Sequence, residues 1–186
     1  MNEGIRQSLL KNIWLHSYAR ASYQEVISFT ESLRRFSSIQ PNSHQRAFSA
    51  ATLIAYCRPF KAKKGVRLPS DMIPDEYAEL HRTMLTLRDK VISHHDPITP
   101  RTSFGYLNRV SIRITGKNWK SSTTFPVIPP KTAQEVQHLA GILQKKCDER
   151  IKTAVEALRL DTHFQDGDYV VEPEEDSDKF TIRQTT

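Results

Sequence analysis

Residues 74–97, PDEYAELHRTMLTLRDKVISHHDP, contain the most informative helical pattern of the chain. Pro74 suits the first turn of a helix, and the acidic residues that follow it favour a helix N-terminus. Apolar side chains then recur every three or four residues, which predicts a core-facing stripe of about four turns. The stripe consists of Tyr77, Leu80, Met84, Leu87 and Val91. Pro97 disfavours helical backbone at the residue before it, so we expect this helix to end near His94–His95.

The remaining pattern predicts a mainly α protein, an antiparallel bundle of four to five helices. Residues 5–36 have apolar side chains at helical spacing, and they form either two helices that meet near Ser22 or one bent helix. The next helix is expected to begin near Ser43 and to end at about Cys57, because Pro59 cannot continue the hydrogen-bonding pattern.

A period of two replaces the helical period in the middle of the chain. Residues 107–115 alternate between apolar and polar side chains, which predicts a strand. Residues 116–118 (Gly-Lys-Asn) suit a turn, and residues 119–125 suit a returning strand. A β-hairpin near residues 106–126, within an insertion at 105–128, is therefore predicted.

The last predicted helix follows a capping box formed by Thr132 and Glu135 and extends to about Leu158. We therefore expect one helical domain over residues 1–160 and a flexible acidic tail over residues 161–186. The short apolar runs of the tail predict a segment that is either mobile or docked, without a core of its own.

The charge of the chain is distributed unevenly. The net charge is +6, although residues 166–178 hold seven carboxylates and neither Lys nor Arg. The remaining body is strongly basic and suits a polyanion such as RNA, because binding releases counterions. The acidic tail could compete with that partner, or it could simply increase solubility.

The composition favours a cytoplasmic protein. No apolar run reaches the length of a membrane span, and the N-terminus lacks the pattern of a signal peptide, so no membrane partner is expected. Cys57 and Cys147 each lie in a helical pattern, which predicts reduced thiols in the core.

An Arg, a carboxylate and two His are grouped at the end of the 74–97 helix: Arg88, Asp89, His94 and His95. In a regular helix, His81, Arg88 and His95 share a face, because seven residues drift by only about 20°. His94 continues the apolar stripe instead. If the last turn unwinds before Pro97, either imidazole can approach Arg88, and the sequence leaves both assignments open.

These groups suit RNA cleavage without a metal or cofactor. A helix C-terminus favours a protonated imidazole, so a His there can exchange a proton near neutral pH. Arg88 stays charged and can bind two phosphate oxygens, while Asp89 can orient a neighbouring cation or His. Together the groups could activate a ribose 2′-hydroxyl, stabilise the phosphorane charge and protonate the leaving 5′-oxygen.

The segment from Arg88 to His94 resembles the Arg-polar-x(3–5)-His signature of the higher-eukaryote and prokaryote nucleotide-binding (HEPN) superfamily. Residues 55–60 (AYCRPF) also resemble a segment of uncharacterised bacterial members, and the resemblance extends over residues 5–158. It implies an antiparallel four-helix bundle that forms a homodimer, with two motifs in one composite, metal-independent RNase site. It also implies that Arg88 binds phosphate, that Asp89 is the polar residue and that His94 is the family histidine, although His95 fits the spacing. A role in defence or as a toxin, with an antitoxin or regulatory protein as partner, follows from the resemblance alone.

Basic residues outside the motif are candidate RNA contacts: Lys61, Lys63, Lys64, Arg109 and Arg113. The His and Cys residues show no zinc-ligand spacing beyond the adjacent His94–His95, and there is no glycine-rich phosphate loop, so no metal is predicted. Two alternatives remain open. One is a catalytically silent helical module that binds an RNA or protein partner through the motif face, and the other is a structural protein without a nucleic-acid role.

Overall fold

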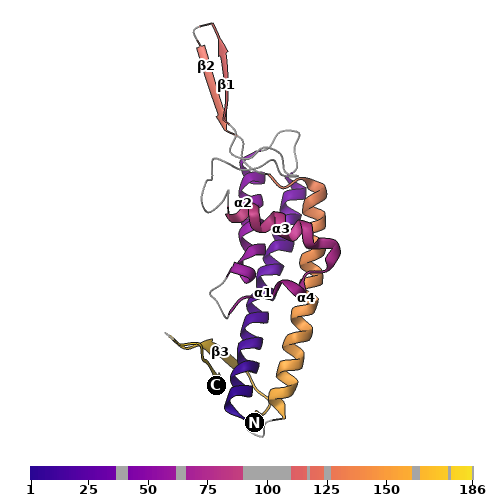
Figure 1. The fold of residues 1–186 in the computed structure, drawn as a ribbon, viewed down its shortest axis with the longest axis vertical. Helices are drawn as coiled ribbons and strands as arrows, with labels where there is room; N and C mark the ends of the chain where they lie inside the picture. Colours follow the sequence, from indigo (N-terminus) through magenta and orange to yellow (C-terminus); the bar gives the residue numbers. More distant parts are fainter. Residues whose placement is uncertain are drawn as a thin grey trace. The chain divides into compact units, whose positions relative to one another are not determined.

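The computed structural model describes residues 1–36, 42–61, 66–89, 110–116, 118–123, 127–160, 164–175 and 177–185. Over these residues the protein is mainly helical and contains two small antiparallel hairpins (Figure 1). The helices are α1 (Glu3–Arg35), α2 (Ser43–Lys61), α3 (Ala78–Leu87) and α4 (Pro130–Arg159), with 3₁₀ turns at η1 (Ser70–Met72) and η2 (Asp75–Tyr77). The strands are β1 (Val110–Thr115) and β2 (Asn118–Thr123), paired with each other, and β3 (Tyr169–Pro173) and β4 (Phe180–Gln184), paired likewise.

The chain divides into two compact units, and helices α1, α2 and α4 contribute to both. The terminal unit comprises Met1–Gln24, Arg58–Met72 and Gly141–Thr186. The central unit comprises Glu25–Cys57 and Ile73–Ala140.

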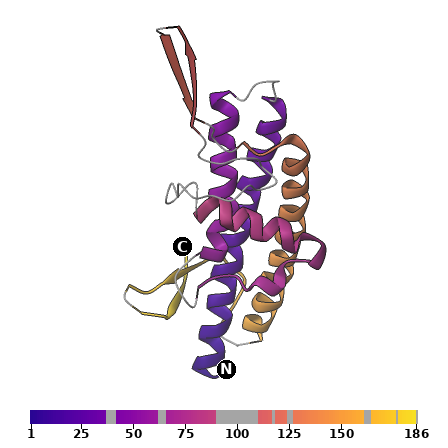
Figure 2. The same ribbon diagram turned by 45° about the horizontal axis from the view of Figure 1, so that its top comes forward.

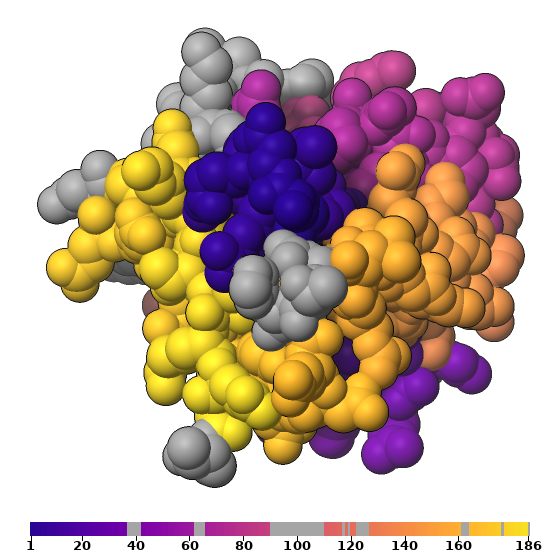
Figure 3. All heavy atoms as spheres, turned by 90° about the horizontal axis from the view of Figure 1, so that it is seen from below, coloured from indigo at the N-terminus to yellow at the C-terminus, as the bar shows by residue number. Residues whose placement is uncertain are grey.

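In the terminal unit, α1 and α4 run antiparallel. Leu10 of α1 and Leu158 of α4 belong to one buried cluster, while Arg20 Nε lies 2.6 Å from Asp148 Oδ1. Phe180 of β4 completes the cluster with 3% of its surface exposed, and its ring lies 5.7 Å from that of Trp14. Atoms of the N-terminal and C-terminal residues lie against each other on the face seen in Figure 3.

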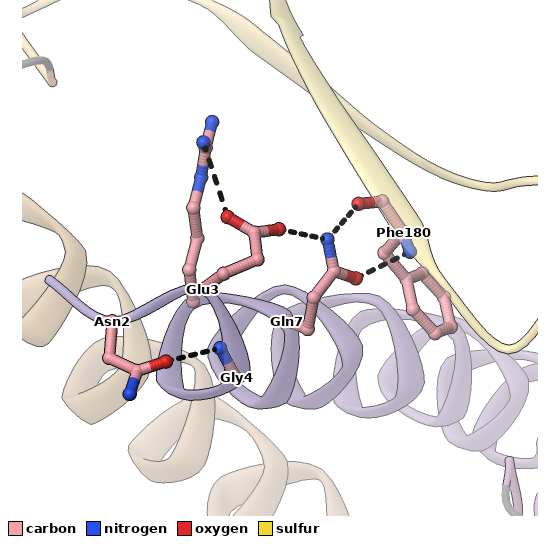
Figure 4. A network of polar contacts seen from close by, with 6 residues as sticks. Asn2, Glu3, Gly4, Gln7 and Phe180 are labelled. Atoms are coloured by element: carbon pink, nitrogen blue, oxygen red, sulfur yellow. Dashed lines mark hydrogen bonds and ion pairs between the residues drawn. The ribbon is translucent and has the colours of Figure 1, made fainter.

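The C-terminal segment differs from the flexible tail expected over residues 161–186. Strands β3 and β4 form a hairpin beside the first half of α1 (Figure 2), and Phe180 is part of the core. The side-chain amide of Gln7 holds this strand: Gln7 Nε2 donates to Phe180 O at 3.1 Å, and Phe180 N donates to Gln7 Oε1 at 2.8 Å (Figure 4). Of the mobile and docked alternatives, the described residues therefore support the docked one.

In the central unit, the second half of α1 packs against α2 and the first half of α4. The rings of Phe29 and Phe48 lie 6.3 Å apart, and Gln137 Nε2 donates to Glu31 Oε1 at 3.4 Å. Large apolar side chains that are fully buried in this unit come from all four helices: Val26, Leu53, Tyr56, Met84, Leu87, Val136 and Leu139. Met84 and Leu87 confirm part of the predicted core-facing stripe, whereas Tyr77 and Leu80 are only half-buried.

Of the two alternatives for residues 5–36, two helices that meet near Ser22 or a single helix, the structure has the single helix. Helix α1 is continuous from Glu3 to Arg35, and Ser22 is buried within it. The predicted start of α2 is confirmed. Asn42 caps it: Gln45 N donates to Asn42 Oδ1 at 2.9 Å, and Asn42 N donates to Gln45 Oε1 at 3.0 Å. Such a reciprocal pair satisfies two backbone N–H groups that the first turn leaves without partners.

The predicted end of α2 at Cys57 is wrong, because the helix continues through Pro59 to Lys61. Pro59 and Phe60 are both buried, and the burial of these side chains outweighs the hydrogen bond that proline cannot make. Leu68 N then donates to Pro59 O at 2.9 Å, which fixes the segment that follows.

The predicted central hairpin is confirmed over its described residues. Strand β1 pairs with β2 in the register Val110↔Thr123 to Thr115↔Asn118. Gly116 has a φ of 60°, a conformation that costs glycine little, and this explains why the turn falls at this position. Pro74 precedes the 3₁₀ turn η2 rather than the first turn of α3 itself. The predicted continuation of α3 through Val91 to His95 lies outside the described residues.

Candidate functional site

The helix that carries the motif is fixed by buried polar contacts with α2. The Tyr56 hydroxyl and His81 Nδ1 are hydrogen-bonded at 2.8 Å, and the Cys57 thiol donates to Met84 O at 3.5 Å. Burial raises the pKa of Tyr56 above its ordinary value, so the hydroxyl remains protonated. These contacts set the position of α3, and through it the position of the residues at its C-terminal end.

Sequence reasoning placed His81 on the same face as Arg88 but did not identify the partner of His81. Tyr56 lies in the AYCRPF segment, which drew attention only through the family resemblance. The signal that could have revealed this hydrogen bond was a Tyr on a helix of small residues, because the hydroxyl of a buried Tyr requires a hydrogen-bond partner.

Arg88 and Asp89 lie directly after the last residue of α3. The Arg88 N–H donates to the carbonyl oxygens of Met84 and Leu85, so the backbone continues the helical turn. Arg88 Nη1 lies 2.9 Å from Asp89 Oδ1. A guanidinium is favoured at this end of a helix, and Asp89 is tolerated there because it pairs with Arg88.

Both side chains of this pair remain partly accessible, with 36% of Arg88 and 37% of Asp89 exposed. At such exposure the ion pair adds little to stability. Nη1 supplies only part of the donor capacity of the guanidinium, which leaves N–H groups that can bind phosphate oxygens. Asp89 therefore orients Arg88 and at the same time offsets its charge, so a bound phosphate must share Arg88 with this carboxylate.

The other predicted catalytic residues, His94 and His95, lie outside the described residues. The same holds for Lys63, Lys64 and Arg109 among the predicted RNA contacts. Of the predicted catalytic set, the described structure thus brings together Arg88 and Asp89.

The two predicted RNA contacts that are described belong to different units. Lys61 is the exposed last residue of α2, in the terminal unit. Arg113 is exposed on β1, in the central unit, and lies opposite Lys120 of β2. Two cations directly opposite each other on a hairpin repel, so a bound polyanion would relieve this repulsion.

The opposite face of β1 is apolar and exposed. Val110, Ile112 and Ile114 are 60%, 66% and 73% exposed, respectively. The strand is therefore amphipathic, although the described residues show no core beneath its apolar side chains.

The N-terminal end of α3 is acidic, whereas its C-terminal end carries the Arg88–Asp89 ion pair. Glu76, Glu79 and Glu135 line a cavity there, together with Tyr77, whose hydroxyl is 2.7 Å from His138 Nδ1. Carboxylates repel phosphate, so a polyanion on α3 is favoured at the Arg88 end.

The described part of the chain contains no group of three or more His, Cys, Asp or Glu side chains arranged to hold a metal ion. Within the same residues, none of the helices combines the length and the apolar character needed to span a membrane. Both Cys57 and Cys147 are buried thiols that form no disulfide, and burial raises the pKa of Cys147 to about 12. The prediction of thiols in the core is thereby confirmed.

Comparison with known families, with curated proteins and with solved structures finds no match for this chain.

Proposed function

We propose that this protein is a metal-independent endoribonuclease of the HEPN type, with Arg88 as the residue that binds the scissile phosphate. The observation that carries the proposal is the placement of Arg88. It follows the last residue of a helix anchored by buried contacts, it is 36% exposed, and a carboxylate orients it at 2.9 Å. A planar cation at such a helix end is suited to a phosphodiester.

The proposed reaction is an internal transfer at phosphorus. A His of the motif, assigned to His94 with His95 as the alternative, removes the proton of the 2′-hydroxyl. The 2′-oxygen attacks phosphorus, the bond to the 5′-oxygen breaks, and a protonated His donates a proton to that oxygen. The products are a 2′,3′-cyclic phosphate and a 5′-hydroxyl, so neither metal nor redox chemistry is required.

The same proposal includes an oligomeric state and a biological role. In it, an antiparallel helical bundle forms a homodimer in which the two motif helices face each other across a twofold axis. RNA is the substrate, and Arg113 with Lys120 supplies backbone contacts. A cytoplasmic location and a defence or toxin–antitoxin role, with an antitoxin as partner, belong to this proposal.

A second candidate is a catalytically silent helical module that binds an RNA or protein partner. Two observations favour it. Asp89 already offsets the charge of Arg88, and Ile112 and Ile114 present exposed apolar surface of the kind found at interaction sites.

Cleavage of end-labelled RNA by the purified chain in excess EDTA separates the two candidates. The endoribonuclease proposal predicts cleavage by the wild type and a loss of roughly 100-fold or more in rate for Arg88→Ala, because transition-state charge loses its stabilising cation. Arg82→Ala is the matched control, since Arg82 is an exposed cation on the same helix and should leave the rate unchanged.

His94→Ala and His95→Ala assign the acid/base residue, and the acting one should lose roughly 100-fold with little change in RNA affinity. Absence of cleavage by the wild type on structured and unstructured RNA would contradict the endoribonuclease proposal. Equal rates for Arg88→Ala and Arg82→Ala would remove Arg88 from it. RNA binding without cleavage would favour the silent module.

A further inference from the structure

The terminal unit contains a cavity of about 650 Å³ that the predicted RNase chemistry does not use. It is lined by the first half of α1, by the segment that includes η1, and by the second half of α4. Its volume lies in the range typical of small-molecule sites. None of its lining residues belongs to the Arg88–Asp89 site.

Four cationic side chains from these three elements line the cavity: Lys11, Arg67, Lys146 and Arg150. Two carboxylates, Asp71 and Glu149, also line it, so the formal charge of the lining is positive. Lys146 Nζ donates to Met72 O at 2.9 Å and thereby fixes α4 to the η1 segment. Within the described residues, Lys11, Arg67 and Arg150 make no ion pair, so their charges remain available to an anion.

His16 supplies the most buried polar group of this lining, with 6% of its surface exposed. Its Nδ1 lies 2.8 Å from Asn12 O, a carbonyl that can only accept, so Nδ1 carries the hydrogen. Nε2 is therefore the ring nitrogen left for a ligand. Burial lowers the pKa of His16, and the positive charge of Arg150 lowers it further although the Asn12 hydrogen bond opposes this.

Apolar side chains complete the lining, among them Leu9, Leu15 and Met72, of which Leu15 and Met72 are buried. A bare inorganic anion would leave this apolar wall in contact with water. A ligand with an anionic group and an apolar body would instead satisfy both parts of the lining.

We propose that this cavity binds a small organic phosphate, with its phosphate near Arg150 and His16 and its organic part against Leu9 and Met72. The charge comes from side chains on three chain elements that converge on one hollow, where they meet the buried His16. The inference is independent of the proposed RNase activity, because it uses different residues.

Binding of the ligand should be coupled to protonation of His16. The charged groups that line the cavity with His16 are Lys11 on α1, Arg67 and Asp71 on the η1 segment, and Lys146, Glu149 and Arg150 on α4. A bound phosphate dianion offsets the effect of Arg150 and favours the protonated imidazole, whose Nε2 can then donate to a phosphate oxygen. Binding near neutral pH should therefore take up protons.

Isothermal titration calorimetry on the full chain in EDTA and low salt tests this proposal with phenyl phosphate and inorganic phosphate as probes. We expect phenyl phosphate to bind with a Kd below about 1 mM, and inorganic phosphate to bind at least about tenfold more weakly. Arg150→Ala should weaken phenyl phosphate binding at least about tenfold. Lys145→Ala is the matched control, because Lys145 is an exposed cation of α4 that does not line the cavity.

The Arg88→Ala variant keeps this test separate from the RNase proposal, because it removes phosphate binding at Arg88. Adding Arg150→Ala to it should still weaken phenyl phosphate binding at least about tenfold. If Arg150→Ala does not fold, as judged by its thermal unfolding, Lys11→Ala replaces it with the same expected loss. Four results would overturn the proposal: no binding of phenyl phosphate up to about 10 mM, equal affinity for both probes, equal losses in Arg150→Ala and Lys145→Ala, or no further loss when Arg150→Ala is added to Arg88→Ala.

Discussion

Replacing Phe180 with Ala should destabilise the protein strongly, although Phe180 lies only six residues before the last residue of the chain, Thr186. Phe180 is 3% exposed and forms a buried cluster with Leu10 and Leu158, and its ring lies 5.7 Å from that of Trp14. A mobile tail would make none of these contacts. The substitution therefore tests whether the C-terminal hairpin is part of the fold.

The expected magnitude follows from the burial of the ring. Phe→Ala at a buried site costs about 3–5 kcal/mol, through lost transfer free energy and the cavity left behind. Several neighbours of Phe180, among them Trp14 and Ile182, are only partly buried and can relax, so we expect the lower end, about 3 kcal/mol. With a urea m-value near 2.5 kcal/mol/M, this loss lowers the midpoint by about 1.2 M.

Urea unfolding followed by circular dichroism measures this shift. Lys179→Ala is the matched control, because Lys179 is the exposed neighbour on the same hairpin and its truncation should change stability by less than about 0.5 kcal/mol. If Phe180→Ala and Lys179→Ala unfold at the same urea concentration, the C-terminal hairpin does not contribute to the core and Phe180 does not stabilise the fold.

Three further predictions concern the polar groups. Tyr56→Phe should lower the free energy of unfolding, measured with urea, by about 1–3 kcal/mol, because it removes the buried hydrogen bond to His81. Tyr77→Phe, which removes an exposed hydrogen bond, should cost less. Because burial lowers the pKa of His16, the unfolded chain binds a proton at higher pH than the folded chain, so wild-type stability should fall as the pH drops through about 6.5. His16→Gln should reduce that pH dependence in urea titrations, and an unchanged slope would exclude His16 as its source. Arg113→Ala should reduce, by about one unit, the slope of the logarithm of the RNA-binding constant against the logarithm of the salt concentration. An unchanged slope would remove β1 from the RNA contacts.

Local patterns predicted the elements whose stabilising contacts are short-range in sequence. The stripe of Met84 and Leu87 is buried, and Gly116 forms the turn of the central hairpin. The periodicity of the apolar residues predicts the buried stripe, and the conformational freedom of Gly116 predicts the turn. The Arg88–Asp89 pair could be predicted from the sequence for the same reason, because the two residues are adjacent.

The features that sequence reasoning missed depend on contacts between distant segments. Phe180 docks through Leu10 and through the side-chain amide of Gln7, which no local pattern connects to the C-terminus. Helix α2 passes through Pro59 because tertiary burial outweighs the preference of proline to end a helix. The cavity at His16 is lined by three chain elements that are distant in sequence. Its positive charge therefore could not be predicted before the fold placed these elements together.

The chemistry of the RNA product ends tests the proposed activity most directly. The wild type is incubated in excess EDTA with an oligoribonucleotide, and with the same oligonucleotide carrying one deoxyribose at the cleaved position. The proposal predicts a 2′,3′-cyclic phosphate and a 5′-hydroxyl from the first substrate and no cleavage at that position of the second, because the 2′-hydroxyl is the nucleophile. Product ends with a 3′-hydroxyl and a 5′-phosphate, cleavage at the deoxyribose, or no cleavage of either substrate would contradict it.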